Sequence, residues 1–338
     1  MSLDLYVDGT RWRSHLRATA DRYPGIVPVA KGNGYGFGLA SLARRAEWLG
    51  CSTIAVGTYR EVGAVRQRFS GDVLVLEPWR PFLTDVPYDD RIVHTVGRDA
   101  DLAALATATP SPRVVLEGLT SMRRHGFAAP DLVAARRAAH GVRIQGHALH
   151  LPMDRSYVAE AQTWLAAAPS PRWYVSHLSR ADLDDLHRRH PEVQLLPRIG
   201  TELWLGDRGS LSVRATVLDA HRVRRGDRVG YRQRRVPREG VVLVVSGGTA
   251  HGIGLEAPAA GTSPRRRAAT LARGGLDAAG RALSPYVVGG RRRWFVEPPH
   301  MQVSMILVPA DVEAPGVGDE IEAQVRFTTT LVDAVHLS

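Results

Sequence analysis

The sequence predicts an α/β fold in which a (β/α)8 TIM-like barrel is followed by a C-terminal β-rich domain. From residue 26 to about 205, apolar strand patterns alternate with amphipathic helix patterns. Eight such strands with intervening helices, over roughly 180 residues, fit a compact barrel. After Gly206 the helical periodicity gives way to short alternating runs separated by Gly, Pro and Arg-rich turns. We therefore assign residues 1–208 to the barrel and residues 209–338 to the β domain.

The predicted elements of the barrel follow one another in order along the chain. The strands are Ile26–Lys31, Thr53–Gly57, Asp72–Glu77, Ile92–Val96, Arg113–Glu117, Val142–Leu151, Arg172–Leu178 and Glu192–Arg198. The helices are Leu39–Leu49, Arg60–Phe69, Asp99–Ala108, Asp131–Ala139, Tyr157–Ala168 and Arg180–His190. The segment Pro78–Asp90 has little helical periodicity and is broken by two prolines, so no helix is predicted there.

The predicted strands of the β domain are short. They are Val213–Val217, Val241–Val245, Tyr286–Val288, Trp294–Val296, Gln302–Val308 and Glu320–Val325. Between them, Pro264–Gly280 contains Arg265–Arg267 and an alanine-rich stretch. This segment is expected to be an inserted helix or a loop.

Composition limits the class of protein. Hydrophobic residues make up 44% and charged residues 23% of the 338 residues, as in ordinary soluble globular proteins. No apolar run reaches the length of a membrane span, and the N-terminus lacks the pattern of a signal peptide, so we expect a cytoplasmic protein. Cys51 is the single cysteine, which excludes an intramolecular disulfide and any CxxC metal or redox motif. No metal site is predicted.

The net charge of +10 raises the question of nucleic acid or an anionic membrane surface as a partner. The arginines are spread along the chain, with unbroken triplets only at Arg265–Arg267 and Arg291–Arg293. No nucleic-acid-binding motif accompanies them. We interpret the charge as a solvated surface and expect neither nucleic acid nor membrane as a partner.

Lys31 is the one lysine among 44 Lys and Arg residues. Arginine can replace lysine in salt bridges and anion contacts, but it does not lose a proton near neutral pH and attack a carbonyl. Lys31 also ends an apolar strand and precedes a glycine-rich turn, at the end of a strand where α/β folds place their chemistry. Chance survival of one surface lysine is the alternative.

The stretch Ala30–Gly38, read as Ala-Lys-Gly-Asn-Gly-Tyr-Gly-Phe-Gly, resembles the pyridoxal-phosphate motif of alanine racemases, A/V-K-x-N-A-Y-G-H-G. The resemblance implies that Lys31 holds the cofactor as an internal aldimine and that Tyr35 contacts its phosphate. Gly34 and Phe37 depart from the motif, where alanine and histidine are usual. The family works as a homodimer, and the amino-acid substrate binds at the cofactor.

Other matches follow the same family pattern along the barrel. Arg124, in Met122–Phe127, matches the arginine of M-x-R-L-G-F, which lies beside the cofactor and the substrate carboxylate. Seven residues earlier the family often has a carbamylated lysine that holds this arginine, and here Glu117 supplies a carboxylate directly. An exposed loop salt bridge is the alternative interpretation for these two residues.

Several cofactor contacts are implied by resemblance alone. His150 stands where the family packs a histidine on the pyridine ring, and Ser179 matches the end of H-x-A-N-S, which contacts the phosphate. Arg198 and Gly200 match R-x-G, in which the arginine faces the pyridine nitrogen and the following amides face the phosphate. The hydroxyl of Thr201 could replace part of a lost phosphate contact.

In the β domain, Val229-Gly230-Tyr231 resembles the family's V-x-Y-G. The family's tyrosine comes from the partner subunit and is the second acid/base, whereas the structural alternative is an ordinary half-buried strand tyrosine. Met301 matches the methionine of M-D-Q near the substrate carboxylate.

Two departures concern the substrate entrance. Thr249 and His251 replace the tyrosine and aspartate of the family's G-Y-A-D-G. After Thr328–Thr330 we find no match to the tail that carries the family's Y-R-x-P-R tyrosine. Both changes predict a wider entrance than that of a strict alanine racemase.

Taken together, the residues favour a pyridoxal-phosphate-dependent racemase with two bases, Lys31 and Tyr231 of the partner subunit, assisted by Arg124. A decarboxylase or aldolase of the same fold on a larger amino acid is an alternative, although Arg198 argues against a strong electron sink. A cofactor carrier or regulator without turnover and an arginine-rich binder of nucleic acid or membrane are the others.

Overall fold

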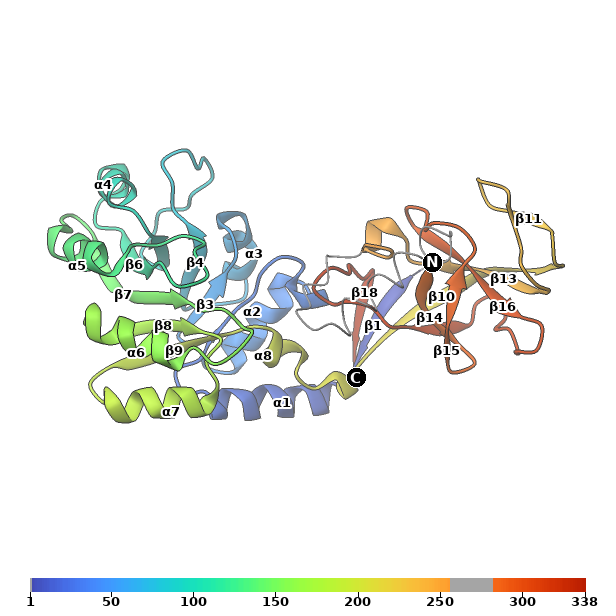
Figure 1. The fold of residues 1–338 in the computed structure, drawn as a ribbon, viewed down its shortest axis with the longest axis horizontal. Coiled ribbons are helices and arrows are strands. Elements are labelled where there is room, and N and C mark those ends of the chain that lie inside the picture. Colours follow the sequence, from blue (N-terminus) through green and yellow to red (C-terminus); the bar gives the residue numbers. More distant parts are fainter. Residues whose placement is uncertain (1, 256–281) are drawn as a thin grey trace. The chain divides into compact units, whose positions relative to one another are not determined.

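The computed structural model describes residues 2–255 and 282–338. Their contacts divide the chain into two compact units, which we call the barrel unit (residues 13–206) and the β unit (residues 2–12, 207–255 and 282–338). Figure 1 shows helices around the strands of the barrel unit and mainly strands in the β unit. Across the described parts of the chain, no helix is long and apolar enough to cross a membrane.

Eight parallel strands form the barrel, which confirms the predicted fold. They are β2 (Val27–Pro28), β3 (Thr53–Val56), β4 (Asp72–Pro78), β5 (Ile92–Val96), β6 (Arg113–Gly118), β7 (Arg143–His150), β8 (Arg172–Ser176) and β9 (Gln194–Ile199). Their order is β2-β9-β8-β7-β6-β5-β4-β3, and a parallel bridge between Val29 and Ala55 closes the ring.

One helix precedes the first of these strands, and the other helices each follow a strand (Figure 1). They are α1 (Gly9–Arg22), α2 (Leu39–Trp48), α3 (Val62–Arg66), α4 (Asp99–Ala108), α5 (Ala129–Ala138), α6 (Val158–Ala167), α7 (Arg180–Arg189) and α8 (Thr201–Leu205). Residues 79–91, all of which are described, contain no helix, as the broken periodicity of Pro78–Asp90 predicts. The helix predicted over Arg60–Phe69 is shorter, and α1 was not predicted.

Small and medium apolar side chains fill the interior of the barrel. They are Val27, Val29, Ala55, Leu74, Val93, Val115, Ala148, Tyr174 and Leu196, and all are buried. Because the strands are parallel, the residues that follow each strand meet at one end of this packed core. That end is where the predicted site residues of the barrel unit lie.

The β unit is built around its longest strand, β10 (Leu211–Val223). The other strands of the sheet are β1 (Leu3–Val7), β13 (Gly240–Ser246), β14 (Leu283–Val288), β15 (Arg291–Phe295), β16 (Val303–Pro309), β17 (Glu320–Ala323) and β18 (Ala334–Leu337). Their order is β13-β16-β15-β14-β17-β10-β1-β18, and β10 pairs again with β13, so that six of the strands close on themselves. A separate two-stranded ribbon, β11 (Arg228–Val229) and β12 (Arg234–Arg235), projects from this sheet (Figure 1).

The N-terminal residues differ from the predicted division at residue 208. The structure divides the chain after Gly206 and places residues 2–12 with the β unit, although we had assigned them to the barrel. The reason is pairing: β1 is antiparallel to β10, with Leu3 opposite Ala215, and parallel to β18. The predicted helix or loop Pro264–Gly280 lies entirely outside the described residues, which exclude 256–281.

Candidate active site

Lys31 lies just beyond the carboxyl end of β2, in backbone that is fixed on both sides. The amide of Val29 donates to Ile199, and the amide of Ala30 donates to Ala55, which continues the barrel pairing up to the lysine. On the far side, the carboxylate of Glu61 accepts the amide of Gly32 at 2.8 Å and that of Gly57 at 2.6 Å. Glu61 therefore ties the loop after Lys31 to the end of the neighbouring strand β3.

The environment of Lys31 favours its neutral form. Desolvation by the surrounding protein lowers the pKa of Lys31, and the positive charges of Arg124 and Arg198 lower it further, whereas Glu61 acts in the opposite direction. Lys31 is nonetheless exposed to solvent. A lysine with a lowered pKa and an accessible amine is suited to nucleophilic attack on a carbonyl.

Tyr35, Gly200 and Thr201 meet next to this loop. Tyr35 is buried, which raises the pKa of its hydroxyl to about 12, and its hydroxyl hydrogen-bonds to the Thr201 side chain. A Cβ at position 200 would lie only 2.2 Å from the Tyr35 oxygen, so glycine is needed for the tyrosine to reach this place. The structure thus brings together three of the residues predicted to hold a phosphate.

Arg198 is a buried cation near the end of β9. Its Nη2 donates to the carbonyl of Leu149 at 2.8 Å, while its Nε is buried and finds no hydrogen-bond partner among the described residues. Burial lowers the pKa of Arg198, and the charge of Glu117 partly offsets this effect. An unpartnered buried donor is costly, and an acceptor supplied from outside the chain would satisfy it.

Glu117 is also buried, at the end of β6, and has two side-chain neighbours. Arg124 approaches it at 3.9 Å, but the Nε2 atom of His125 is closer, at 3.1 Å. The predicted partnership of Glu117 and Arg124 is therefore present as a long ion pair, with Arg124 half-exposed. His125, which stands where the family motif has leucine, is therefore the nearer partner of Glu117.

His150, at the end of β7, is held in its neutral form. Burial, with the positive charges of Arg198 and Arg124, lowers its pKa to about 2. Its Nδ1 lies 3.3 Å from the Ser176 hydroxyl, and its ring meets His177 edge to face at 5.0 Å. His147 on the same strand is instead packed edge-on against Trp173, which is a core position.

Ser179 is the N-cap residue of helix α7. Its hydroxyl donates to the carboxylate of Asp182 at 2.8 Å and accepts the Asp182 amide, which forms a capping box at the start of α7. The Ser-x-x-Asp spacing is a sequence signal for this cap. A phosphate contact by Ser179 stays a prediction.

In the β unit, Tyr231 lies in the turn between β11 and β12 and is 85% exposed. It is not the half-buried strand tyrosine of the structural alternative. Met301 is 73% exposed. Both border a hollow of about 760 Å³ within this unit, which Thr249 and His300 also line.

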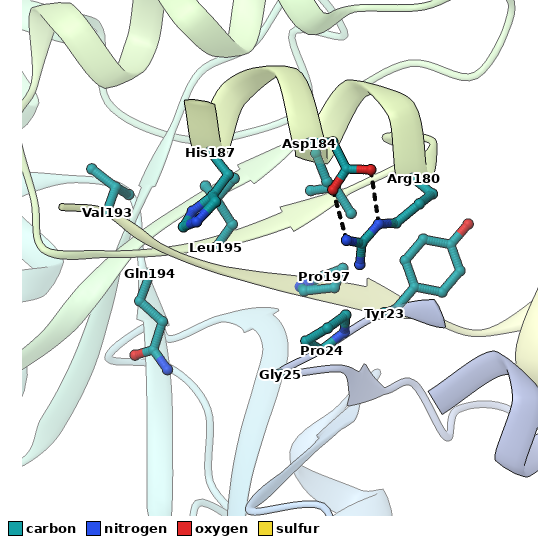
Figure 2. A pocket seen from close by; sticks show the side chains of 11 residues that line it. Tyr23, Pro24, Gly25, Arg180, Asp184, His187, Val193, Gln194, Leu195 and Pro197 are labelled. Atoms are coloured by element: carbon teal, nitrogen blue, oxygen red, sulfur yellow. Dashed lines mark hydrogen bonds and ion pairs between the residues drawn. The ribbon is translucent and has the colours of Figure 1, made fainter. Parts of the chain in front are cut away.

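A different hollow, of about 330 Å³, lies at the opposite end of the barrel. Figure 2 shows its lining: Tyr23–Gly25 before β2, residues of α7, and the start of β9. Arg180 and Asp184 form an ion pair across its edge at 2.7 Å. Most of these residues precede β2 or lie at the start of β9, and neither Lys31 nor Arg198 lines the hollow. The chemistry of barrel proteins is found at the carboxyl ends of the strands, where Lys31 and Arg198 lie.

The fold and the site define a class of protein: a closed (β/α)8 barrel with a lysine of lowered pKa at a strand end, followed by an antiparallel β unit. The chain belongs to the alanine racemase family, because the family model described as "Alanine racemase, N-terminal domain" matches residues 7–188, more than half of the chain. No curated protein matches in a sequence search.

Solved structures of the same fold are similar over nearly the whole chain. Alanine racemase from E. faecalis is 20% identical with a TM-score of 0.71, covering 99% of this chain and 98% of that one. Alanine racemase from Bartonella henselae, with covalently bound pyridoxal phosphate, is 16% identical with a TM-score of 0.70, covering 95% and 90%. Histidine racemase from Leuconostoc mesenteroides is 16% identical with a TM-score of 0.68, covering 100% and 97%. At these identities the likeness shows the fold.

Proposed function

We propose that this protein is a pyridoxal-phosphate-dependent amino-acid racemase that uses two bases, Lys31 and Tyr231 of the partner subunit. The observation that carries the proposal is that the sole lysine, whose pKa is lowered, lies at the same end of the barrel as a buried arginine whose Nε finds no hydrogen-bond partner among the described residues. Both groups lie at the carboxyl ends of barrel strands. Together they suit a ligand that offers a carbonyl carbon to the lysine and a hydrogen-bond acceptor to the arginine.

The residues present fit the cofactor. The amine of Lys31 would hold its aldehyde carbon, and the Nε donor of Arg198 would face the pyridine nitrogen. Tyr35, Thr201 and the Gly200 backbone would receive the phosphate, with Ser179 as a further candidate, and neutral His150 would pack on the ring. When bound, pyridoxal phosphate acidifies the α-C–H bond of an attached amino acid.

Arg198 would also restrict the chemistry. A guanidinium is a donor only and cannot give up a proton to the ring nitrogen at working pH, so that nitrogen stays unprotonated. This limits how far negative charge is drawn into the ring. Short-lived charge at the α-carbon favours racemisation over decarboxylation or aldol cleavage.

Inversion needs proton exchange on both faces of the α-carbon, because one base would tend to return the proton to the side it came from. Lys31 would serve one face, and Tyr231 of the partner subunit in a homodimer would serve the other. Arg124, which Glu117 holds, and Met301 would contact the substrate carboxylate. The exposure of Tyr231 supports this arrangement, since the side chain is free to be covered by a second copy.

The substrate is proposed to be larger than alanine and polar or acidic. Thr249 stands in place of an entrance tyrosine, which removes bulk that excludes large side chains. Residues 221–240, which carry Tyr231, contain eight arginines and only two acidic residues. Arg228 and Arg235 even face each other across the β11–β12 ribbon, where like charges are unfavourable and an anion nearby would relieve them.

The test combines attachment and turnover. Borohydride reduction of the cofactor-loaded protein, followed by peptide mass spectrometry, is expected to find the pyridoxyl group on the Lys31 peptide. A panel of D- and L-amino acids should show racemisation and α-deuterium incorporation in heavy water, with alanine turned over no better than glutamate, arginine or serine. A yellow protein that exchanges no α-proton in any amino acid would instead identify a carrier. A clear preference for alanine would rule out the wide entrance.

A further inference from the structure

Tyr231 is touched by a small cluster of the β unit that does not belong to its own turn. The ring of His300 lies against the ring of Tyr231, with the centroids 4.6 Å apart and the planes tilted by 43°. The Nε2 atom of His300 is hydrogen-bonded to Oε1 of Glu297 at 2.6 Å. Nothing in the family motif around Tyr231 requires this pair, which comes from the segment Glu297-Pro298-Pro299-His300.

Glu297 lies against the two residues that flank Tyr231 in the sequence, Gly230 and Arg232. Its carboxylate is buried and lies so close to Gly230 that a Cβ there would be 2.2 Å away. Gly230 has a φ of +73°, which a glycine adopts without strain. On the other side, the amide of Arg232 points to Oε2 at 3.5 Å. A buried carboxylate needs donors, and here the donors are His300 and the backbone beside Tyr231.

His300 is itself fixed to the sheet. Its amide donates to Val303 at 2.9 Å, and its carbonyl accepts the Thr249 amide at 2.8 Å. The two prolines before it restrict the backbone between Glu297 and His300. The pair is therefore anchored to the start of β16, whereas Tyr231 stands on an exposed turn.

We propose that Glu297 and His300 are positioning residues that hold the phenol ring of Tyr231 in one orientation for proton exchange. The proposal rests on the proposed role of Tyr231 as the second base. An exposed tyrosine would otherwise sample several staggered χ1 positions, and a misplacement of about 1 Å can cost on the order of 100-fold in rate. His300 supplies the ring contact, and Glu297 fixes the His300 ring and the backbone of the turn.

The test uses variants that separate the two contacts. His300→Gln keeps a donor toward Glu297 but loses the ring, His300→Phe keeps a ring but loses the donor, and Glu297→Gln keeps the volume but loses the charge. The matched control is His336→Gln, because His336 also stacks on a tyrosine, Tyr6, at 4.7 Å and bonds a carboxylate, Asp4, at 2.9 Å in the same unit. Tyr231→Phe is the reference.

The decisive readout is the isotope effect of each α-deuterated enantiomer of a racemised amino acid. When proton removal by Tyr231 is slowed, the primary isotope effect rises for the enantiomer whose α-proton faces Tyr231, and does not rise for its mirror image. We expect Tyr231→Phe to identify that enantiomer, and His300→Gln and Glu297→Gln to reproduce the same one-sided rise with kcat lowered about 10-fold. His336→Gln should leave both isotope effects and kcat unchanged.

A second readout needs no turnover. With tyrosine labelled in its ring, the Tyr231 resonance, assigned by its loss in Tyr231→Phe, should shift in His300→Gln and stay near its original position in His300→Phe. An unshifted resonance in His300→Gln, or isotope effects that change equally for both enantiomers, would overturn the positioning role. If Tyr231→Phe itself gives no one-sided isotope effect, the proposed second base is wrong, and the positioning role fails with it.

Discussion

The carboxyl ends of the barrel strands and the β11–β12 turn both carry predicted site residues, but they hold them in opposite ways. At the barrel, Tyr35, Glu117 and Arg198 are buried. Tyr35 and Arg198 contact residues of other strand ends, and Glu117 contacts His125 in the loop after its own strand. At the turn, Tyr231 is 85% exposed, and its ring contacts that of His300, which is hydrogen-bonded to Glu297. One region is assembled by the packing of its own unit, and the other presents a side chain outward.

The two units therefore differ in which part of the proposed site each can form on its own. The barrel unit brings together most of the residues that we propose to hold the cofactor, including a buried donor that lacks an acceptor among the described residues. In the β unit, Tyr231 and the hollow beside it are open to solvent as far as the described residues show. We infer that cofactor binding is a property of the barrel, whereas turnover requires the turn to be covered, as in a homodimer with shared sites.

The largest effect is expected at Lys31. Lys31→Ala should remove all covalent attachment of the cofactor and lower activity by at least about 10³-fold, because no other lysine can replace the amine. Lys31→Arg is the matched control that keeps the charge and should be equally inactive. Absorbance after dialysis and mass spectrometry after borohydride measure attachment, and a protein that stays yellow in either variant would refute the assignment.

Tyr231→Phe is expected to lower kcat by about 10²–10⁴-fold, the usual contribution of a general acid/base, while the cofactor stays attached. Mixing it with Lys31→Ala subunits tests the shared site. With free subunit exchange in a closed dimer, roughly one quarter of the wild-type activity should return, since half of the dimers regain one site. No recovery despite proven exchange would place both bases in one chain.

The pH dependence of Lys31 reactivity is a smaller effect. Since the pKa of Lys31 is lowered, its amine in the cofactor-free protein should become neutral, and therefore acylated, at lower pH than an ordinary lysine. Arg124→Gln removes a positive neighbour and should shift the profile to higher pH, whereas Glu61→Gln should shift it to lower pH, each pH unit being tenfold in neutral amine. The rate is measured by mass spectrometry on the sole lysine. If both variants gave the same pH profile as the unaltered protein, the charges of Arg124 and Glu61 would have no effect on the pKa of Lys31.

Glu117→Gln should lower kcat/KM roughly 10-fold, because the charge that holds Arg124 and His125 is lost while the volume is kept. Activity of the unaltered protein should not depend on bicarbonate, since a carboxylate already occupies the position. Full activity in Glu117→Gln would show that the long contact to Arg124 has no role in turnover.

The smallest effect is expected at Ser179. Ser179→Ala should lower the free energy of unfolding by about 1 kcal/mol through the loss of the α7 cap. Ser179→Ala should lower cofactor affinity less than Thr201→Val does, because the Thr201 hydroxyl, which contacts Tyr35, is lost in the latter variant. Denaturant unfolding and cofactor titration separate the two, and a larger affinity loss in Ser179→Ala would support the phosphate contact.

Features whose residues lie close together in the chain could be predicted from the sequence. Lys31, the strand ends and the helix-free segment after β4 could be read because periodicity, composition and a motif lie within a few residues of each other. The Glu297–His300 pair could not be found in this way, since it acquires meaning only when the β11–β12 turn folds against it. The strand β1 was missed for a related reason: its pairing partner β10 lies about 200 residues later in the chain.

The position of β1 has a consequence for synthesis on the ribosome. Leu3, Leu5 and Val7 are buried in the finished sheet, but their partners β10 and β18 are translated after the entire barrel unit. At a synthesis rate of about 5–20 residues per second, β1 is without its partner for roughly 10–40 s until β10 has been translated. The barrel can fold in that interval as an insertion between the first two strands of the β unit. Closure of the β unit around the waiting strand is then the last folding event, and the exposed apolar strand is the part of the nascent chain that most needs protection from aggregation.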